Sequence, residues 1–334
     1  MQRVRLKEVT FTPEGVEKIP IPKGGFLQRI QIHLFGDIET TDSSIINDGG
    51  LAKAIKKISL VADSETIMEI SGLSGAIKDI YDYKTFKNIN RLDRQSIYLD
   101  LEDQDITEDG MLSLLPTMHY STVYLQIEWG KVEDIGSNIE INEIKAEIIA
   151  DIILPDELLN TLAEELRDSL EDEIEDENQL NEAIQEGIEA CLSTITTRYI
   201  KEITVIPPQQ LGEITIQVPE DGVCSNLLLI TLAGNKLVDD LIDRYSVKTP
   251  SQVLVDEISF LASQNQDMVE YSLGREVKGA TMVEIAGDTE EESITIKAKI
   301  KKLYKNAKII VVAQYTKLNP KIERLLEELY PDAE

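Results

Sequence analysis

Cysteine and long apolar runs are both rare in this sequence. Its 334 residues include two cysteines, Cys191 and Cys224, which lie in segments of different periodicity. Two such cysteines cannot form a disulfide framework, so we interpret both as small buried apolar residues. The longest apolar runs, Leu227–Ile230 and Ile309–Ala313, are far shorter than the roughly 20 residues that cross a bilayer. The sequence therefore excludes a disulfide-stapled scaffold and a transmembrane helix.

Histidine and aromatic side chains, which many active sites need, are also few. There are two histidines, and the sequence contains no phosphate-binding loop, no dinucleotide fingerprint and no zinc motif. His33 alternates with strand residues, and His119 stands next to Tyr120 without a nucleophile motif, so we interpret them as a strand residue and a loop residue. Trp129 is the single tryptophan and aromatics total 5%, which leaves little stacking surface for a sugar-cleaving cleft. The sequence predicts no catalytic, cofactor-binding or metal-binding residue.

Basic residues are outnumbered, 33 against 62 acidic ones, and the net charge is −29. So acidic a chain repels nucleic acid, and we predict no direct nucleic-acid binding. The segment 155–196 has 14 acidic residues and one basic one, a net charge of −13. The Arg3, Arg5 and Lys7 cluster could contact phosphates or lipid headgroups, although a solvated strand face is the favoured interpretation. The N-terminal segment lacks the apolar region of a secretory signal, so we expect the chain to act in a cytoplasm.

An acidic stretch near residue 105 is the best candidate for a metal site, because hard cations bind several oxygen ligands from one loop. Its members are Asp100, Glu102, Asp103, Asp105, Glu108, Asp109 and Gly110. The calcium-loop spacing fails: with Asp105 and Asp109 as the first and fifth positions, Pro116 stands where a bidentate Glu is needed. We interpret the stretch as a solvated acidic turn, and we predict no cofactor while leaving open a structural divalent cation.

Hydrophobic periodicity divides the chain into two β lobes separated by helices. Apolar residues alternate with polar ones over most of residues 1–153, as in Ile30, Ile32 and Leu34, and the alternation resumes after Tyr199. Between the lobes the spacing changes to three or four residues, which predicts an acidic helical hairpin that begins at Pro155. A short amphipathic helix is expected from residue 320.

The two β lobes repeat each other. With a constant offset, Pro22 corresponds to Pro219 and Gly25 to Gly222, which gives a strand, a Pro-x-x-Gly turn and a second strand in both copies. Further on, residues 55–64 match residues 255–264, with Ile, Ser and Ala identical at three positions. After this match we expect a further strand in each copy, at 68–71 and at 268–272. The simplest explanation is a duplicated β-sandwich.

The run from Gly50 to Gly72, GLAKAIKKISLVADSETIMEISG, follows a Pro-x-x-Gly-Phe strand pair and precedes a strand at 97–101. In this setting it resembles the first jelly roll of double jelly-roll major capsid proteins, which form the shells of tailless icosahedral double-stranded DNA viruses. The resemblance covers roughly residues 1–153 and 198–318. It implies two eight-stranded jelly-roll sandwiches side by side, perpendicular to the shell, and three chains in a pseudo-hexagonal capsomer.

We therefore expect a mainly β protein without enzymatic activity, a structural major capsid protein that trimerises and assembles an icosahedral shell. The expected parts are the first jelly roll at 1–154, an acidic helical hairpin at 155–197, the second jelly roll at 198–318, and a C-terminal helix and tail at 319–334. The expected partners are further copies of the chain, other capsid or vertex proteins, and an internal viral membrane at the shell base. The expected location is the virion, after assembly in the host cytoplasm. Two alternatives remain open: a two-sandwich receptor- or carbohydrate-binding spike module, and an acidic β-sandwich glycosidase.

Overall fold

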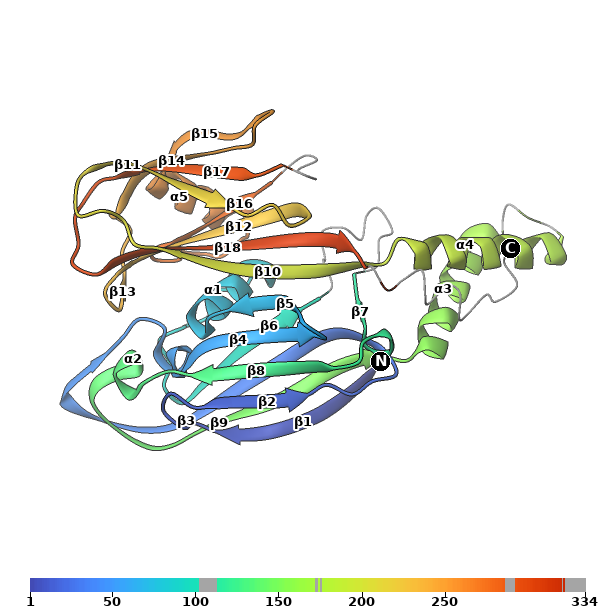
Figure 1. The fold of residues 1–334 in the computed structure, drawn as a ribbon, viewed down its shortest axis with the longest axis horizontal. Helices are drawn as coiled ribbons and strands as arrows, with labels where there is room; N and C mark the ends of the chain where they lie inside the picture. Colours follow the sequence, from blue (N-terminus) through green and yellow to red (C-terminus); the bar gives the residue numbers. More distant parts are fainter. Residues whose placement is uncertain (102–112, 172–173, 175, 286–291, 320, 322–334) are drawn as a thin grey trace.

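The computed structural model describes residues 1–101, 113–171, 174, 176–285, 292–319 and 321. Two β lobes lie side by side with their strands roughly parallel, and a pair of helices projects beyond one end of the strands (Figure 1). The first lobe contains β1 (Gln2–Thr10), β2 (Val16–Pro20), β3 (Phe26–Ile46), β4 (Ile55–Ala62), β5 (Glu65–Ile70), β6 (Arg94–Asp100), β7 (Leu115–Pro116), β8 (Val123–Trp129) and β9 (Gly136–Ile153). Its helical segments are η1 (Gly50–Ala54), α1 (Gly72–Asp82), η3 (Thr117–His119) and α2 (Val132–Ile135).

The second lobe follows the helix pair α3 (Pro155–Leu170) and α4 (Glu177–Ser193). It contains β10 (Thr196–Val205), β11 (Gly212–Val218), β12 (Val223–Ala233), β13 (Lys236–Leu237), β14 (Ile242–Lys248), β15 (Val253–Ser259), α5 (Phe260–Glu270), β16 (Ala280–Glu284), β17 (Ile294–Ile300) and β18 (Ala307–Leu318). The mainly β architecture with two helices between the lobes is the one that the periodicity predicts. The expected C-terminal helix lies outside the described residues, apart from Asn319 and Lys321.

Strand order identifies each lobe as a jelly roll. In the first lobe, one sheet has the order β1-β9-β3-β6 and the facing sheet the order β5-β4-β8-β2. In the second lobe the orders are β10-β18-β12-β16 and β11-β17-β14-β15. Without the two-residue strands β7 and β13, each lobe has eight strands in the described residues, which can be counted from one to eight along the chain. In both lobes, one sheet then has the strand order 1-8-3-6 and the other has the order 2-7-4-5. The described residues thus contain two eight-stranded sandwiches of the same topology, as predicted.

A β-bulge marks the duplication at single-residue level. On β3 the register with β9 shifts between Leu27 and Arg29, and on β12 the register with β18 shifts between Cys224 and Asn226. These positions differ by the same offset that relates Pro22 to Pro219. A bulge bends its strand and is kept as a designed feature, so its repetition supports a common origin of the lobes.

The second half of the predicted repeat is wrong. Residues 55–64 form β4 and the turn after it, whereas residues 255–264 form the end of β15 and the start of α5, so these two segments are not equivalent. The structure has no strand at 268–272, because α5 occupies residues 260–270. Its N-cap is Ser259, whose side chain accepts a hydrogen bond from the backbone N–H of Ala262, and Ser71 caps α1 in the same way through Ser74. The correct correspondence therefore equates Glu-Ile-Ser at 69–71 with Glu-Ile-Ser at 257–259, and each lobe has a helix between its fifth and sixth strands.

The helices α3 and α4 form an arm, in which their apolar side chains pack mainly against each other. Pro155 occupies the first turn of α3 with Asp156 and Glu157, where proline fits and acidic side chains favour the helix dipole. Leu162 and Ile184 are among the buried residues between the helices. Phe26 at the start of β3 belongs to the same apolar cluster and attaches the arm to the first lobe. Within the described residues, no helix is long and apolar enough to span a membrane.

Candidate functional site: the junction between the lobes

The two lobes are joined edge to edge by their strands. β10 of the second lobe pairs in parallel with β5 of the first, at Ile200 opposite Met68 and Lys201 opposite Glu69. One sheet therefore runs through both lobes (Figure 1). Backbone hydrogen bonds at this seam fix the register of one jelly roll against the other.

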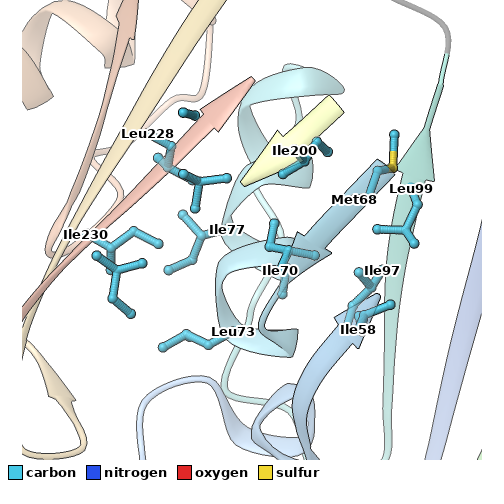
Figure 2. Packing of buried hydrophobic residues seen from close by; sticks show 14 of the residues in the cluster. Ile58, Met68, Ile70, Leu73, Ile77, Ile97, Leu99, Ile200, Leu228 and Ile230 are labelled. Carbon is cyan, nitrogen blue, oxygen red and sulfur yellow. The ribbon is translucent and has the colours of Figure 1, made fainter. Parts of the chain in front are cut away.

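The helix α1 fills the space beside this seam with apolar side chains. Figure 2 shows Ile77 on α1 facing Leu228 and Ile230 of β12 in the second lobe. These side chains are at most 1% exposed, so the contact excludes water. Glycine allows the helix to lie close to the first lobe: a Cβ at Gly72 would stand 2.1 Å from the carbonyl oxygen of Ala52. The buried core is continuous from one lobe to the other.

Tyr81, near the end of α1, connects three elements. Its hydroxyl donates to the carbonyl of Ala280 on β16 at 3.2 Å and to the carboxylate of Asp267 on α5 at 3.3 Å. Its ring makes a T-shaped contact with Tyr271, with centroids 5.3 Å apart. The side chain is 1% exposed, so the hydroxyl has no access to water, and these partners supply its hydrogen bonds instead.

A group of buried charges lies next to these contacts. Lys78 on α1 is fully buried and lies 2.7 Å from a carboxylate oxygen of Asp82 and 3.3 Å from one of Asp79. From the second lobe, Arg198 lies 3.5 Å from Asp82 and donates to the side-chain oxygen of Gln314. Arg198 therefore reaches across the junction to Asp82, which also pairs with Lys78 on its own helix. Burial removes the hydration of both charges, so a buried ion pair adds little net stability. Its main effect is to fix the relative position of the groups that carry the charges.

The titration of this group follows from burial and charge. Burial raises the pKa of Asp79 to about 7, although Lys78 opposes the shift, and the backbone N–H of Tyr98 donates to the carboxylate at 3.0 Å. Burial alone would raise the pKa of Asp82, but Lys78 and Arg198 outweigh it and lower that pKa. Burial also raises the pKa of Asp267 to about 6. Asp267 in turn accepts the N–H of Met282 at 2.9 Å, so both lobes use a helix aspartate to hold their sixth strand.

Polar contacts also close the rim of the junction. Asp48 in the first lobe accepts the backbone N–H of Leu237 at 2.8 Å and lies 3.8 Å from Lys236 and 3.7 Å from Lys278. Lys53 donates to the carbonyl of Asn235 at 3.1 Å. The seam, the helix, the buried charges and the rim together give the two lobes a large and continuous contact.

The two histidines lie in the first lobe, one on a strand and one in a short helical turn. His33, on the outer face of β3, has its Nδ1 2.9 Å from the hydroxyl of Ser96 and its Nε2 3.2 Å from the side-chain oxygen of Gln31. Burial lowers the pKa of His33, so its neutral form is favoured. His119 is buried in η3, while Ser121 is exposed. The strand assignment of His33 is confirmed, whereas the loop assignment of His119 is replaced by a short helical turn.

Two surface grooves offer no acid–base pair. One, of about 350 Å³, lies on the outer face of the first lobe and is lined by His33, Phe35, Lys87, Arg91 and Tyr98, among others, with no carboxylate in its lining. The other, of about 330 Å³, is lined by residues around Lys18, Lys23 and Tyr124 and also lacks a carboxylate. A glycosidase needs two facing carboxyl groups, and neither groove supplies them.

The remaining candidates from the sequence are the acidic stretch that begins at Asp100 and the two cysteines. Asp100 is buried and accepts hydrogen bonds from Arg29 and from the hydroxyl of Tyr83, the latter at 2.7 Å. The rest of the acidic stretch, residues 102–110, lies outside the described residues. Within the residues that the structure describes, no group of three or more His, Cys, Asp and Glu side chains is placed to hold a metal ion. Cys224 is buried, and burial raises the pKa of its thiol to about 12, while Cys191 is half-buried.

Sequence reasoning missed the residues that matter at the junction. No helix is predicted at residues 72–82, so neither α1 nor the buried Lys78 is among the expectations from the sequence. A signal was present, because Ser71 stands where an N-cap belongs and Leu73, Ile77, Ile80 and Tyr81 have helical spacing. That Lys78 is buried could not be inferred, since an isolated lysine on a helix is normally exposed.

No family model and no curated protein matches the sequence. The structure, however, is similar along nearly its whole length to solved viral capsid structures. With a crystal structure of the STIV MCP the TM-score is 0.68 at 14% identity, covering 97% of this chain and 98% of that one. An atomic structure of Sulfolobus turreted icosahedral virus gives the same score and identity, covering 99% and 95%. The major capsid protein P2 of bacteriophage PM2 gives a TM-score of 0.52 at 11% identity, covering 94% and 97%. These likenesses establish the double jelly-roll fold.

Proposed function

We propose that this protein is a structural major capsid protein that trimerises into pseudo-hexagonal capsomers and assembles an icosahedral shell. The observation that carries the proposal is the junction: two jelly rolls of identical strand order are joined by a shared sheet, a buried helix and buried charges. A joined pair of similar lobes is the unit from which three chains produce six similar positions. The match to capsid proteins over at least 94% of this chain supports the same use.

The proposal includes the division of the chain into a first jelly roll at 1–154, a helical connector at 155–197 and a second jelly roll at 198–318. It assigns no catalytic step to the protein, in keeping with grooves that lack carboxylates. Its partners would be further copies of itself, other capsid or vertex proteins and an internal membrane at the shell base, within a virion assembled in the host cytoplasm. The net charge of −29 argues against contact with the genome.

Imaging of the purified protein tests this function. Permanent subunit contacts commonly bury several thousand Å² in total, so the trimer should persist on dilution to about micromolar concentration. We expect three-fold particles with a six-fold outline in negative-stain micrographs, and a trimer mass by light scattering. A monomer at micromolar concentration, with no particles of this shape, would refute the proposal.

A further inference from the structure

A groove on the first lobe is lined by cations and by no carboxylate. It lies where β3 and β6 meet the loop that joins α1 to β6, and its volume is about 350 Å³. Three of its lining residues, Lys87, Arg91 and Arg94, are cations. Acidic residues outnumber basic ones by 62 to 33 in this chain, so such a lining runs against the overall composition. Clefts lined by one sign of charge concentrate the electric field and attract ligands of the opposite sign.

Lys87 is a cation of this groove that no carboxylate neutralises. Its side chain is half-buried, and its ammonium group lies 4.9 Å from the ring centre of Tyr98 and 5.1 Å from that of Tyr83. Cation–π contacts of this kind hold a cation in place without cancelling its charge. Among the described residues, no carboxylate forms an ion pair with Lys87, and Asp79 interacts with it only at longer range. The ammonium is therefore held ready for an anion.

The two arginines share a single carboxylate. Arg91 donates to Asp93 through two nitrogens, with the Nε at 2.8 Å, and the Nε of Arg94 lies 3.8 Å from the same side chain. Asp93 is exposed and does not line the groove, so the two arginines keep a net positive charge between them. Each guanidinium has five N–H donors, and one shared carboxylate occupies only part of them. The remaining donors are available to a ligand.

We infer that this groove binds a small organic oxyanion, of the phosphate monoester class, through Lys87, Arg91 and Arg94. The inference goes beyond the capsid proposal and does not depend on it. Guanidinium groups suit phosphate because their planar donors bind two of its oxygens at once. The organic part of the ligand would cover the apolar wall, where Phe35 is 50% exposed. Liquid water occupies about 30 Å³ per molecule, so the groove holds more than a bare phosphate ion.

His33 gives the groove a group that responds to the ligand. Its Nε2 lies 3.2 Å from the side-chain oxygen of Gln31, whose amide nitrogen donates to Asp151 at 2.7 Å. The amide oxygen of Gln31 is thus an acceptor, so the proton of neutral His33 lies on Nε2. Its Nδ1 then accepts the hydroxyl proton of Ser96 at 2.9 Å. In this state the Ser96 proton is used within the network and is not offered to the groove.

A second proton on His33 changes what Ser96 offers. With both ring nitrogens protonated, Nδ1 donates to the Ser96 oxygen, and the hydroxyl proton is released to bind an anion. Both residues line the groove, so the imidazolium charge lies beside the same anion. Anion and proton therefore favour each other. By linkage, the ligand raises the pKa of His33 by the same factor by which protonation tightens the ligand.

The charges that face His33 set the starting point of this coupling. Burial lowers the pKa of His33 in the free protein, Glu147 on β9 raises it, and Arg3 on β1 lowers it. From β6, the ring of Tyr98 makes an edge-on contact, with centroids 6.0 Å apart. From the loop, Lys87 adds a further positive charge. The ligand therefore acts on a pKa that begins below the ordinary value of about 6.5.

Calorimetric titration of the purified protein with phenyl phosphate, at constant ionic strength, tests the binding site. We expect saturable binding at one site per chain, weakened at least tenfold by Arg94→Gln and by Lys87→Gln, because each removes a charge-assisted hydrogen bond. Arg244→Gln is the matched control: the Nε of Arg244 lies 3.7 Å from the preceding residue, Asp243, just as Arg94 lies near Asp93, but Arg244 is outside the groove.

Three outcomes of this titration would overturn the inference. The first is a wild-type protein that does not bind phenyl phosphate saturably. The second is a loss of affinity that is the same for Arg94→Gln and for Arg244→Gln, since it would reflect net charge alone. The third is inorganic phosphate that binds as tightly as phenyl phosphate, since the apolar wall would then contribute nothing. None of them bears on the capsid proposal, which imaging tests separately.

A histidine NMR titration tests the coupling. The chain has two histidines, so the ring signals of His33 are identified with the single variant His33→Gln. Saturating phenyl phosphate should raise the pKa of His33, matching a gain in affinity of at least about threefold at acidic pH, and should leave the signals of the buried His119 unchanged. Ser96→Ala should remove most of this gain while keeping the affinity at alkaline pH. A pKa of His33 that phenyl phosphate does not change would overturn the role of His33.

Discussion

The two lobes share their strand order, a β-bulge and a helix between the fifth and sixth strands, yet they use that helix differently. α1 buries ten of its eleven residues, while α5 buries Phe260, Ser263, Gln264 and Asp267. Both helices keep the aspartate that holds the sixth strand, at Asp79 and Asp267. Contacts within a lobe are therefore retained, and contacts between lobes have diverged. A helix inside a jelly roll is fixed by its own sandwich, whereas its outward face adapts to whatever lies beside it.

The largest expected effect is the difference in stability loss between substituting Lys78 on α1 and substituting Gln266, which occupies the equivalent position on α5. Lys78→Ala leaves Asp79 and Asp82 buried with one cation fewer, so the free energy of unfolding should fall by about 3 to 5 kcal/mol. Gln266→Ala, on the exposed side of α5, should change it by less than about 0.5 kcal/mol. Chemical denaturation of both variants measures the difference. Equal losses would mean that the helices play the same role in the single chain.

A smaller effect concerns pH and the aspartate that both helices share. Burial raises the pKa of Asp267 to about 6, above the roughly 3.9 of an unfolded aspartate. The stabilising contribution of a carboxyl with a raised pKa is complete below about pH 4 and is lost as pH rises through about 6. Asp267→Asn should therefore gain on the wild type by roughly 2 kcal/mol between pH 4 and pH 8. Denaturation at both pH values checks this, and parallel pH profiles would contradict it.

Asp79 in the first lobe should change stability with pH in the same direction, because burial raises its pKa to about 7. Lys78 only partly offsets the effect of burial there, and Asp82, whose pKa is lowered, loses its stabilising contribution only at more acidic pH. The first lobe should therefore also lose stability as pH rises through about 7. Asp79→Asn should remove that loss, and an Asp267→Asn variant with no slope left between about pH 4 and pH 8 would contradict a contribution from Asp79.

The smallest effect concerns the acidic arm, which has no counterpart in either lobe. Its carboxylates repel one another within a Debye length of about 8 Å at physiological ionic strength. Divalent cations or higher salt should raise the melting temperature of the assembled protein by about 1 to 2 °C, on the order of 0.5 kcal/mol. A variant with Glu164→Gln, Glu165→Gln and Asp168→Asn should lose much of this response. A melting temperature indifferent to salt in both proteins would count against the idea.

Much of the fold could be predicted because its signals are local. Alternation located the strands, Pro155 and the spacing of leucines located the arm, and the Pro-x-x-Gly turns exposed the duplication. The prediction failed at residues 268–272, where a short apolar pattern fits strand and helix alike. The cap at Ser259 decides for the helix, and its significance appears only when it is set beside Ser71.

The absence of a catalytic motif was also readable from the sequence, since such motifs are short and contiguous. The junction was not, because its members come from α1, β10, β12 and β18, far apart in the chain. Lys78 and Gln266 occupy equivalent helix positions, and no local pattern tells which one is buried. By itself the sequence determined two tandem β lobes joined by an acidic arm, through side-chain periods and turn residues. The tertiary structure alone decided which helix is enclosed and which sheet face is left open, because burial depends on what packs against a surface from elsewhere in the chain.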